Sequence, residues 1–233
     1  MNSVNLSKRL EQVADYVKEG ARLADIGSDH AYLPCYLAEK KQISYAVAGE
    51  VVKGPYENAL KEVRRSGHKE TVDVRLGNGL QVIESADQID TVVIAGMGGA
   101  LIRSILQDGQ DQGRITGQET LILQPNVFEE TVRQYLMKNA YKIEAETILE
   151  ENGKIYEVIK AVPSKEPVTY SKQELLFGPF LGKEKTDIFR KKWAQHLKTD
   201  TFILKQIEQS KEPDEKKITQ LKEEIGLIKE MIA

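Results

Sequence analysis

The chain has 233 residues, of which 40% are hydrophobic and 30% are charged, and its formal net charge is −3. These values describe a water-soluble globular protein with room for one α/β domain and an appendage, and they give no electrostatic case for nucleic acid as a partner. They also argue against a membrane-spanning protein, because the longest apolar runs, such as 91–95, are far shorter than a bilayer requires.

Targeting segments and metal sites are also unexpected. The N-terminus has no apolar signal-peptide core. Cys35 is the only cysteine, so neither an intrachain disulfide nor a cysteine-based zinc site can form. The three histidines are scattered along the chain, which argues against a histidine-rich metal site. We expect a cytoplasmic protein without a membrane segment and without a bound metal.

Residues 3–19 are expected to form an amphipathic helix, because apolar residues recur at helical spacing from Leu6 onward. Ser3 or Asn5 can cap its start, and Gly20 ends it. Two interpretations are open for this helix. It packs over an edge of the sheet, or it forms a lid over a ligand site.

A strand at 22–26, a tight turn and a helix at 32–40 form the βα unit around which the chain is organised. Gly27 opens the turn and lets a ligand approach bare backbone. The unit lacks the G-x-G-x-x-G dinucleotide fingerprint, because Asp29 occupies the second glycine position and its carboxylate would repel a pyrophosphate. A ligand with a cationic centre and no phosphate fits better, and S-adenosyl-L-methionine is such a ligand.

The next two strands also end in polar residues. A strand at 45–49 ends at Glu50, where an acid is expected to bind the ribose hydroxyls of an adenosyl group; the alternative is a solvent-facing carboxylate before a helix at 54–66. A strand at 72–76 leads to Asn78, whose amide can hydrogen-bond the edge of an adenine or belong to a plain Asn-Gly turn.

A fourth strand at 91–95 runs into a glycine-rich turn at 96–99 and then a helix at 100–107. Three glycines in four residues are costly in chain entropy, and they fit a backbone that bends sharply and leaves room for a substrate. Close packing of the helix on the strand is the alternative explanation.

A fifth strand at 120–124 ends in two amide side chains, Gln124 and Asn126, and a helix is expected at 128–138. The carboxyl ends of parallel strands share one rim of the sheet, so these amides are expected near the reacting group together with the turn after the first strand.

Two extended runs at 141–150 and 154–162 read as a β-hairpin. Five parallel strands closed by an antiparallel edge pair are the layout of the Rossmann-like methyltransferases. We therefore predict an α/β fold in which residues 1–162 form a Rossmann-like domain that binds S-adenosyl-L-methionine.

After a proline-marked link at 163–167 the pattern changes to long helices. A helix at 183–210 is followed by a last helix whose apolar residues repeat at spacings of 3 and 4, as in a coiled coil. Residues 163–233 are predicted to form an α-helical hairpin domain. We expect a monomer whose seam is used inside the hairpin, and a dimer through this coiled coil is the alternative.

The chemistry that these residues favour is methyl transfer. The sequence has no Ser-His-Asp arrangement, no Walker lysine loop and no cysteine pair. Transfer from a sulfonium needs an in-line approach and little acid–base work. Where the acceptor is a ring nitrogen, positive charge develops on it, and Asp29 is our candidate to stabilise that charge. His30 is expected to order the site or to contact a phosphate. The alternative is that it only makes a hydrogen bond at the start of the following helix.

The residues at the end of the fourth strand limit which kind of atom can accept the methyl group. It does not carry the Asn/Asp-Pro-Pro-Tyr/Phe motif of enzymes that methylate exocyclic amino groups, and has Ala95-Gly96-Met97-Gly98-Gly99 in its place. This difference argues for another acceptor atom.

Three motifs, at 25–34, 94–99 and 124–126, resemble the TrmK family of bacterial tRNA (adenine-22-N1) methyltransferases, and the resemblance extends over the whole chain, including the helical hairpin. It implies an enzyme that uses S-adenosyl-L-methionine to methylate N1 of an adenine in the D-arm region of tRNA. N1 lies on the Watson–Crick edge, so the base must be unpaired or extruded to react. Asn78 stands where many methyltransferases carry Asp, and it keeps the ability to hydrogen-bond.

The site residues are predicted from the strand ends, and the resemblance implies cofactor contacts by Asp25, Gly27, Ser28, Glu50, Asn78 and Gly79. The predicted cofactor contacts are Asp25, Ile26, Gly27, Ser28, Glu50, Val51, Asn78, Gly79, Ala95, Gly96 and Met97. The predicted catalytic residues are Asp29, His30, Gln124 and Asn126. The predicted tRNA contacts, all cations of the hairpin, are Arg190, Lys191, Lys192 and Lys198.

Two other functions remain open from the residues alone. One is a Rossmann-like methyltransferase that acts on a small molecule or a protein. The other is a tRNA-binding protein without catalytic activity, in which the sheet is only a scaffold.

Overall fold

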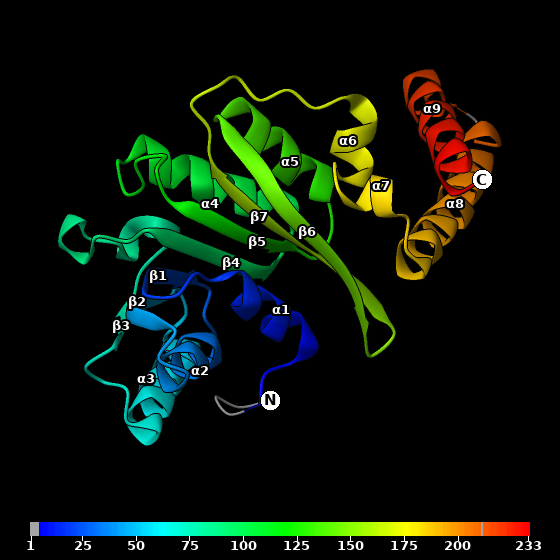
Figure 1. Ribbon diagram of the computed structural model, residues 1–233. Helices are drawn as coiled ribbons and strands as arrows, with labels where there is room; N and C mark the ends of the chain where they lie inside the picture. The colour runs from blue at the N-terminus through cyan, green and yellow to red at the C-terminus, as the bar shows by residue number, and fades with distance from the viewer. Residues whose placement is uncertain (1–4, 211) are drawn as a thin grey trace. The chain divides into compact units, whose positions relative to one another are not determined.

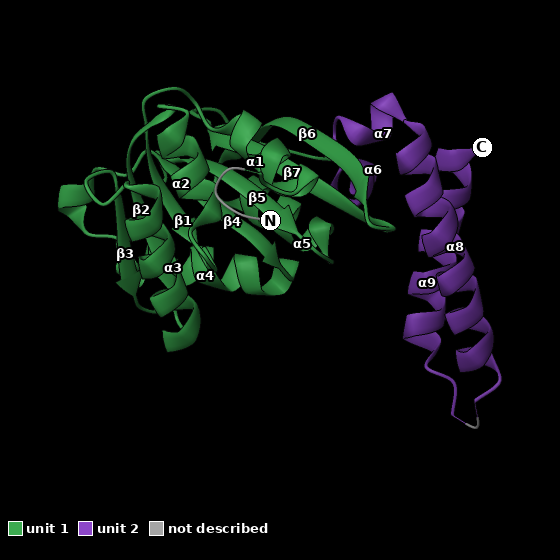
Figure 2. Ribbon diagram, turned by 90° about the horizontal axis from the view of Figure 1, so that it is seen from below, with its two compact units in different colours: residues 1–170 green, residues 171–233 purple. Residues whose placement is uncertain are grey.

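The structure is a computed structural model that describes residues 5–210 and 212–233. The chain divides into two compact units, Met1–Tyr170 and Ser171–Ala233 (Figure 2). The sequence placed this boundary at 162/163, whereas the link up to Tyr170 is part of the first unit. The backbone N–H of Ile143 donates to the Tyr170 hydroxyl at 2.7 Å, and this bond helps to hold the link against the sheet.

The described part of the first unit contains one seven-stranded sheet with the order β3-β2-β1-β4-β5-β7-β6 (Figure 1). β1 to β5 are parallel, and β7 is antiparallel to both β5 and β6. The predicted parallel sheet with an antiparallel edge pair is therefore confirmed. The strands are β1 (Ala21–Ile26), β2 (Ile43–Glu50), β3 (Val72–Leu76), β4 (Thr91–Met97), β5 (Thr120–Pro125), β6 (Tyr141–Glu151) and β7 (Lys154–Pro163).

Helices cover both faces of this sheet (Figure 1). They are α1 (Lys8–Tyr16), α2 (Tyr32–Glu39), α3 (Lys53–Ser66), α4 (Gly99–Asp111) and α5 (Glu129–Lys138), with short 3₁₀ turns η1 (Gly79–Val82) and η2 (Ser85–Asp87). α1 begins later than predicted, because the Ser7 side chain accepts the backbone N–H of Leu10 and caps it there. The predicted cap Ser3 lies outside the described residues.

Strand alternation decides which side chains meet α1. One core cluster joins α1, α2 and α3 with Leu23, Val93 and Ile122 of the sheet, and a second joins α4 and α5 with the alternate residues of the same strands. Successive strand residues point to opposite faces. Asp25 and Gln124, two positions beyond Leu23 and Ile122, therefore point to the face that α1 covers.

The second unit is helical, with α6 (Lys172–Phe177), α7 (Leu181–Glu184), α8 (Asp187–Glu208) and α9 (Glu215–Ile232). The predicted helix at 183–210 is divided, because Lys185 takes a left-handed φ of +48° and the Thr186 side chain caps α8 by accepting the Phe189 N–H. α8 and α9 form the predicted pair. Among the described residues, no helix is long and apolar enough to cross a membrane.

Candidate active site

The site lies where the strand order reverses, between β1 and β4. From there β2 and β3 extend to one side and β5 to the other. Open α/β sheets bind ligands outside the carboxyl ends of their strands at this switch point. The turns after β1 and β4 meet here, and a Cβ atom on Gly27, whose φ is +72°, would overlap the end of the Met97 side chain.

A cavity of about 220 Å³ opens at the switch point. Its walls come from α1, the turn after β1, the start of α2 and the end of β4. The lining residues are Arg9, Leu10, Asp25, Gly27, Ser28, Asp29, Tyr32, Leu33, Ala95 and Gly96. Six of the residues predicted for the site are thus brought together around one space.

Two buried carboxyl groups stand at the ends of adjacent strands. Asp25 is 5% exposed and accepts a hydrogen bond from the Ser28 hydroxyl. Burial raises the pKa of Asp25 to about 7, and the Ser28 hydrogen bond opposes this shift. Glu50 accepts the backbone N–H of Asp29, and burial raises the pKa of Glu50 in spite of that bond. The two carboxyl groups therefore hold the turn at both sides, while Ile26 between them is buried on the opposite face.

Asp29 and His30 extend from this turn. The Asp29 carboxyl is 65% exposed and lies 3.6 Å from Nε2 of His30. The His30 ring stacks on Tyr32 with centroids 5.0 Å apart and planes 10° apart. Asp29 and Ala31 both have a positive φ, of +55° and +53°, an unusual backbone that often marks functional sites. Asp29 thus presents an accessible carboxylate at the cavity, and His30 lies beside it without lining the cavity.

Gln124 is fully buried, and its amide bonds only to groups of the chain. Its oxygen accepts the Arg9 guanidinium and, at 3.0 Å, the backbone N–H of Gly96. Its nitrogen donates to the Pro125 carbonyl at 2.9 Å and to the Asn126 side chain at 3.1 Å. Gln124 therefore connects α1, the end of β4 and the end of β5.

Asn126 joins the same two strand ends from outside. Its backbone N–H donates to the Met97 carbonyl at 2.7 Å, and its side-chain amide donates to the Gly96 carbonyl at 2.7 Å. Asn126 itself is exposed. The conformation of the Gly96–Met97 backbone at the cavity thus depends on both amides that the sequence singled out.

The β2 and β3 ends form the neighbouring part of the rim. The Gly77 N–H donates to the Glu50 carbonyl at 2.7 Å, which keeps these ends together. Val51 is 62% exposed, and Asn78 is exposed as well. Val51, Asn78 and Gly79 do not line the cavity described above. They form an open shelf beside it.

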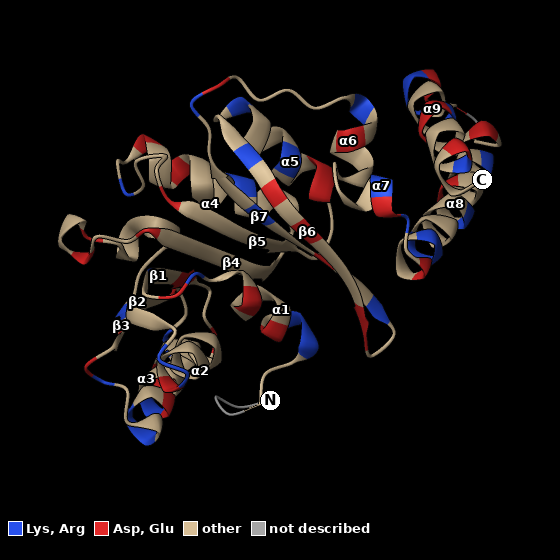
Figure 3. Ribbon diagram, viewed as in Figure 1, with Lys and Arg blue, Asp and Glu red and all other residues tan. Residues whose placement is uncertain are grey.

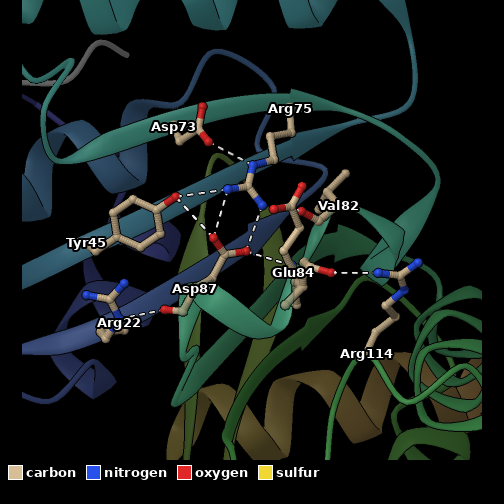
Figure 4. A network of polar contacts seen from close by, with 9 residues as sticks. Arg22, Tyr45, Asp73, Arg75, Val82, Glu84, Asp87 and Arg114 are labelled. Atoms are coloured by element: carbon tan, nitrogen blue, oxygen red, sulfur yellow. Dashed lines mark hydrogen bonds and ion pairs between the residues drawn. The ribbon is translucent and has the colours of Figure 1, made fainter.

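A polar network fixes the segment that leaves this shelf (Figure 4). Arg75 of β3 donates to the two carboxyl oxygens of Asp87 at 2.7 and 2.8 Å and to the Tyr45 hydroxyl at 3.1 Å. It also donates to the Val82 carbonyl at 2.8 Å. Bidentate guanidinium–carboxylate pairs combine strength with a defined geometry. Arg75 therefore holds the segment that runs from Gly79 to η2 against the sheet.

The cations of the helical unit divide into two kinds. Arg190, Lys191 and Lys198 are exposed on α8. Lys192 differs from the prediction because it is only 7% exposed, and its ammonium lies 5.5 Å from the Trp193 ring centroid. It follows Phe189 by three residues, so the helical turn brings it to the buried side of α8. Both signs of charge occur along α8 and α9 (Figure 3).

The aromatic residues of α8 belong to the core of the helical unit. Phe189 and Trp193 are buried together with Phe177, and the rings of Phe177 and Trp193 meet edge to face with centroids 4.6 Å apart. They therefore do not display a surface for base stacking.

Sequence reasoning missed four lining residues, of which Arg9 matters most for the chemistry. Arg9 is held by Gln124, and its guanidinium lies 5.5 Å from the Tyr156 ring centroid. It precedes Leu10 on a helix whose apolar face was recognised, but its partner lies 115 residues away. Its place beside the apolar stripe was the available signal, and its neighbour Lys8 shares that place. Both interpretations of this helix agree with the structure, because α1 packs on the edge pair β6 and β7 and also lines the cavity with Arg9 and Leu10.

Comparison with known proteins decides the family. The profile described as "TrmK: tRNA (adenine(22)-N(1))-methyltransferase" matches residues 23–230. A tRNA (adenine(22)-N(1))-methyltransferase of Bacillus subtilis is 45% identical over 100% of this chain and 99% of its own length. The chain belongs to the TrmK family. The predicted family and enzyme class, tRNA (adenine(22)-N(1))-methyltransferase, are therefore confirmed.

Solved structures of TrmK proteins share the whole fold. The crystal structure of B. subtilis TrmK is 43% identical, with a TM-score of 0.91, and the alignment covers 99% of this chain and 100% of that one. A Streptococcus pneumoniae protein in complex with S-adenosyl-L-methionine is 43% identical, with a TM-score of 0.88, over 98% of this chain and 100% of that one. The predicted cofactor is thus confirmed for the family.

Proposed function

We propose that this chain transfers the methyl group of S-adenosyl-L-methionine to N1 of adenine 22 in tRNA, and that the reaction takes place at the cavity between β1 and β4. The observation that carries this proposal is the constellation around the cavity. The carboxyl groups of Asp25 and Asp29, the hydroxyl of Ser28 and the bare backbone of Gly27 and Gly96 surround one space at the switch point.

The residues present fit the cofactor. A cationic sulfonium and an amino group suit a space that the Asp25 carboxyl group borders, and Arg9 at the same wall suits the cofactor's own carboxylate. The exposed shelf of Val51 and Asn78 suits an adenine, which needs an apolar contact and a hydrogen bond. In this assignment Glu50 binds the ribose hydroxyls, and Gly79, Ala95 and Met97 shape the surroundings. Ile26 is left out of the predicted cofactor contacts, because it is buried on the opposite face of the sheet.

Bound S-adenosyl-L-methionine supplies a sulfonium methyl group that a ring nitrogen can take in line. The chain's own part is orientation and electrostatics. Asp29 places a carboxylate at the cavity, where it stabilises the positive charge that grows on the adenine ring as N1 is methylated. His30, stacked on Tyr32, orients that carboxylate.

Gln124 and Asn126 act as positioning residues in this proposal. Their side-chain amides bond Gly96 at 3.0 and 2.7 Å, and the backbone N–H of Asn126 donates to the Met97 carbonyl at 2.7 Å, so the three bonds hold the Gly96–Met97 backbone. Because small displacements at a reacting centre cost orders of magnitude in rate, fixing this backbone contributes to catalysis without direct contact with the base.

The helical unit is the proposed tRNA-binding part, with exposed Arg190, Lys191 and Lys198 on phosphates. Lys192 is left out of this role because it is buried. If Lys198 contacts a phosphate, Lys198→Ala should weaken binding and reduce the slope of log K against log salt by about 1. An unchanged slope would assign the contact to other cations.

Two further proposals follow from the family and the helix pair. We propose a monomer, because α8 packs on α9 and the seam residues Ile218, Ile225 and Ile228 are only 0–7% exposed in a single chain. We also propose a cytoplasmic location, because the tRNA substrate of such an enzyme is found in the cytoplasm.

The deciding experiment is transfer of labelled methyl groups from S-adenosyl-L-methionine to unmodified bacterial tRNA, with the product digested to nucleosides. We expect 1-methyladenosine at one D-arm position. Asp29→Asn should lower kcat by roughly 10²–10³-fold with little change in cofactor affinity, because Asn also tolerates the left-handed φ and removes only the charge. Cofactor binding without transfer to any tRNA would point to a small-molecule or protein acceptor.

A further inference from the structure

Phe128 is an unusual residue at the rim of the site. It is the only phenylalanine before residue 171, and it is 67% exposed. Val127 beside it is 52% exposed. Large apolar side chains normally gain free energy by burial, so an exposed phenylalanine in a unit with two core clusters calls for an explanation.

The backbone at Phe128 is also unfavourable. Its φ is +61° and its ψ is +46°, the left-handed region. Glycine and asparagine reach this region easily, whereas a bulky aromatic residue in it is a rare exception. The surrounding structure must therefore impose this conformation, and it aims the side chain away from the core.

The imposed conformation comes from the glycine turn. The Gly99 N–H donates to the Val127 carbonyl at 2.8 Å, and the Phe128 carbonyl lies so close to the Gly99 Cα that any side chain there would overlap it. One residue earlier, Asn126 is bonded to Gly96 and Met97. Phe128 is thus rigidly connected to the Gly96–Met97 backbone that borders the cavity.

Phe128 does not itself line the cavity. The target adenine must enter that space to reach the methyl group, and it must leave its own helix to do so. The nucleotides on either side of it remain outside, on the rim. An exposed aromatic ring fixed at that rim suits a flanking base, because every base can stack on an aromatic face.

We propose that Phe128 is a stacking platform for the base next to the target adenine of tRNA, and that it holds the strand while the adenine is in the cavity. The platform rests on the proposed function. Its role is to orient the substrate, and it takes no part in binding the cofactor.

The test combines Phe128 variants with altered tRNA. Phe128→Ala should lower kcat/KM for tRNA by roughly 5- to 150-fold while the Kd for S-adenosyl-L-methionine stays unchanged. Phe128→Trp should retain activity. Phe128→Asn should raise Tm, because asparagine accepts the left-handed φ, and should lose as much activity as Phe128→Ala. Val127→Ala, an exposed apolar neighbour that cannot stack, is the matched control.

An abasic nucleotide placed on either side of the target adenine identifies the partner. On one side of the adenine, the abasic nucleotide should lower the activity of the wild-type protein as much as Phe128→Ala does with normal tRNA. Phe128→Ala with this abasic tRNA should then be no less active than with either change alone. Fully additive effects on both sides would overturn the proposal. Equal losses of kcat/KM in Phe128→Ala and Val127→Ala would also overturn it. A change of oligomeric state in Phe128→Ala would overturn it as well, because the ring would then contact a second copy of the chain.

Two failures are distinguishable. A wild-type protein that transfers no methyl group to tRNA contradicts the proposed function. A wild-type protein that transfers it, with Phe128→Ala equally active, contradicts only the platform.

Discussion

Substitution of Gly99 tests the argument that backbone proximity shapes the rim. A Cβ at Gly99 would overlap the Phe128 carbonyl oxygen and lie 2.9 Å from the Phe128 carbonyl carbon and 3.1 Å from the Val127 oxygen. These are backbone atoms, which cannot rotate away as a side chain can. At the adjacent Gly98, a Cβ would meet only a Val127 methyl group at 3.7 Å, and φ is −73°.

The cost can be estimated from these contacts. Overpacking costs about 1–3 kcal/mol, and separating the two segments also weakens the 2.8 Å hydrogen bond from Gly99 to Val127, worth about 0.5–1.5 kcal/mol. Alanine has a higher helix propensity than glycine, which stabilises the first turn of α4 by up to about 1 kcal/mol and offsets part of this cost. We expect Gly99→Ala to destabilise the first unit by about 2–3 kcal/mol, which lowers its Tm by roughly 4–12 °C.

The measurement is a thermal melt followed by far-UV circular dichroism. Trp193, the only tryptophan, lies in the helical unit, so its fluorescence does not report on the first unit directly. Gly98→Ala, the matched control, should cost about 0.5–1 kcal/mol, because alanine is a poorer N-cap residue than glycine although its Cβ would meet no backbone atom here. If Gly99→Ala and Gly98→Ala have the same Tm, the close approach of the two loops does not constrain the backbone, and the reasoning about the rim is wrong.

Two further predictions concern buried charge. Burial raises the folded-state pKa of Asp25 from 3.8 to about 7, so the folded chain retains a proton that the unfolded chain has lost, and stability falls as pH rises through this window. Asp25→Asn should therefore gain about 2–3 kcal/mol relative to wild type between about pH 5 and about pH 8 in urea unfolding; a pH-independent difference would contradict the shift. Arg133 is fully buried and bonds Glu146 at 2.8 Å and Glu157 at 2.5 Å. Arg133→Met should lower the free energy of unfolding by about 3–5 kcal/mol, whereas substitution of the exposed Arg65 by Met should lower it by less than about 1 kcal/mol. Equal effects in the same urea assay would show that burial of the Arg133 ion pairs is not the cause.

Much of the fold was predictable because its signals are local. Most of the parallel strands are short apolar runs followed by glycine or polar residues, and glycine turns and caps mark several of the helix ends. Gly27, Glu50 and Asn78 were recognisable as rim residues for the same reason, since the position of a residue at a strand end is already set by its neighbours in the chain.

The boundaries that were predicted wrongly depend on contacts or caps outside the periodic pattern. Ser7 starts α1 within the interval where a longer helix was expected, and Thr186 divides the predicted helix at 183–210. The link before Ser171 joins the first unit through contacts such as that of Tyr170 with Ile143, 27 residues away.

The sequence by itself determined the family, the order of βα units and the strand ends at which chemistry is placed, because those features are written in periodicity and in short motifs. The tertiary structure alone decided which side chains share the cavity. Arg9 meets Gln124 only because strand alternation turns Gln124 toward the face that α1 covers, and Lys192 is buried only because the turn of α8 places it beside Trp193. Phe128 stands at the rim because its backbone lies against Gly99, which has no side chain to separate the two segments. The contacts of Arg9 with Gln124 and of Phe128 with Gly99 join residues distant in sequence, and their free energy exists only once the chain has folded.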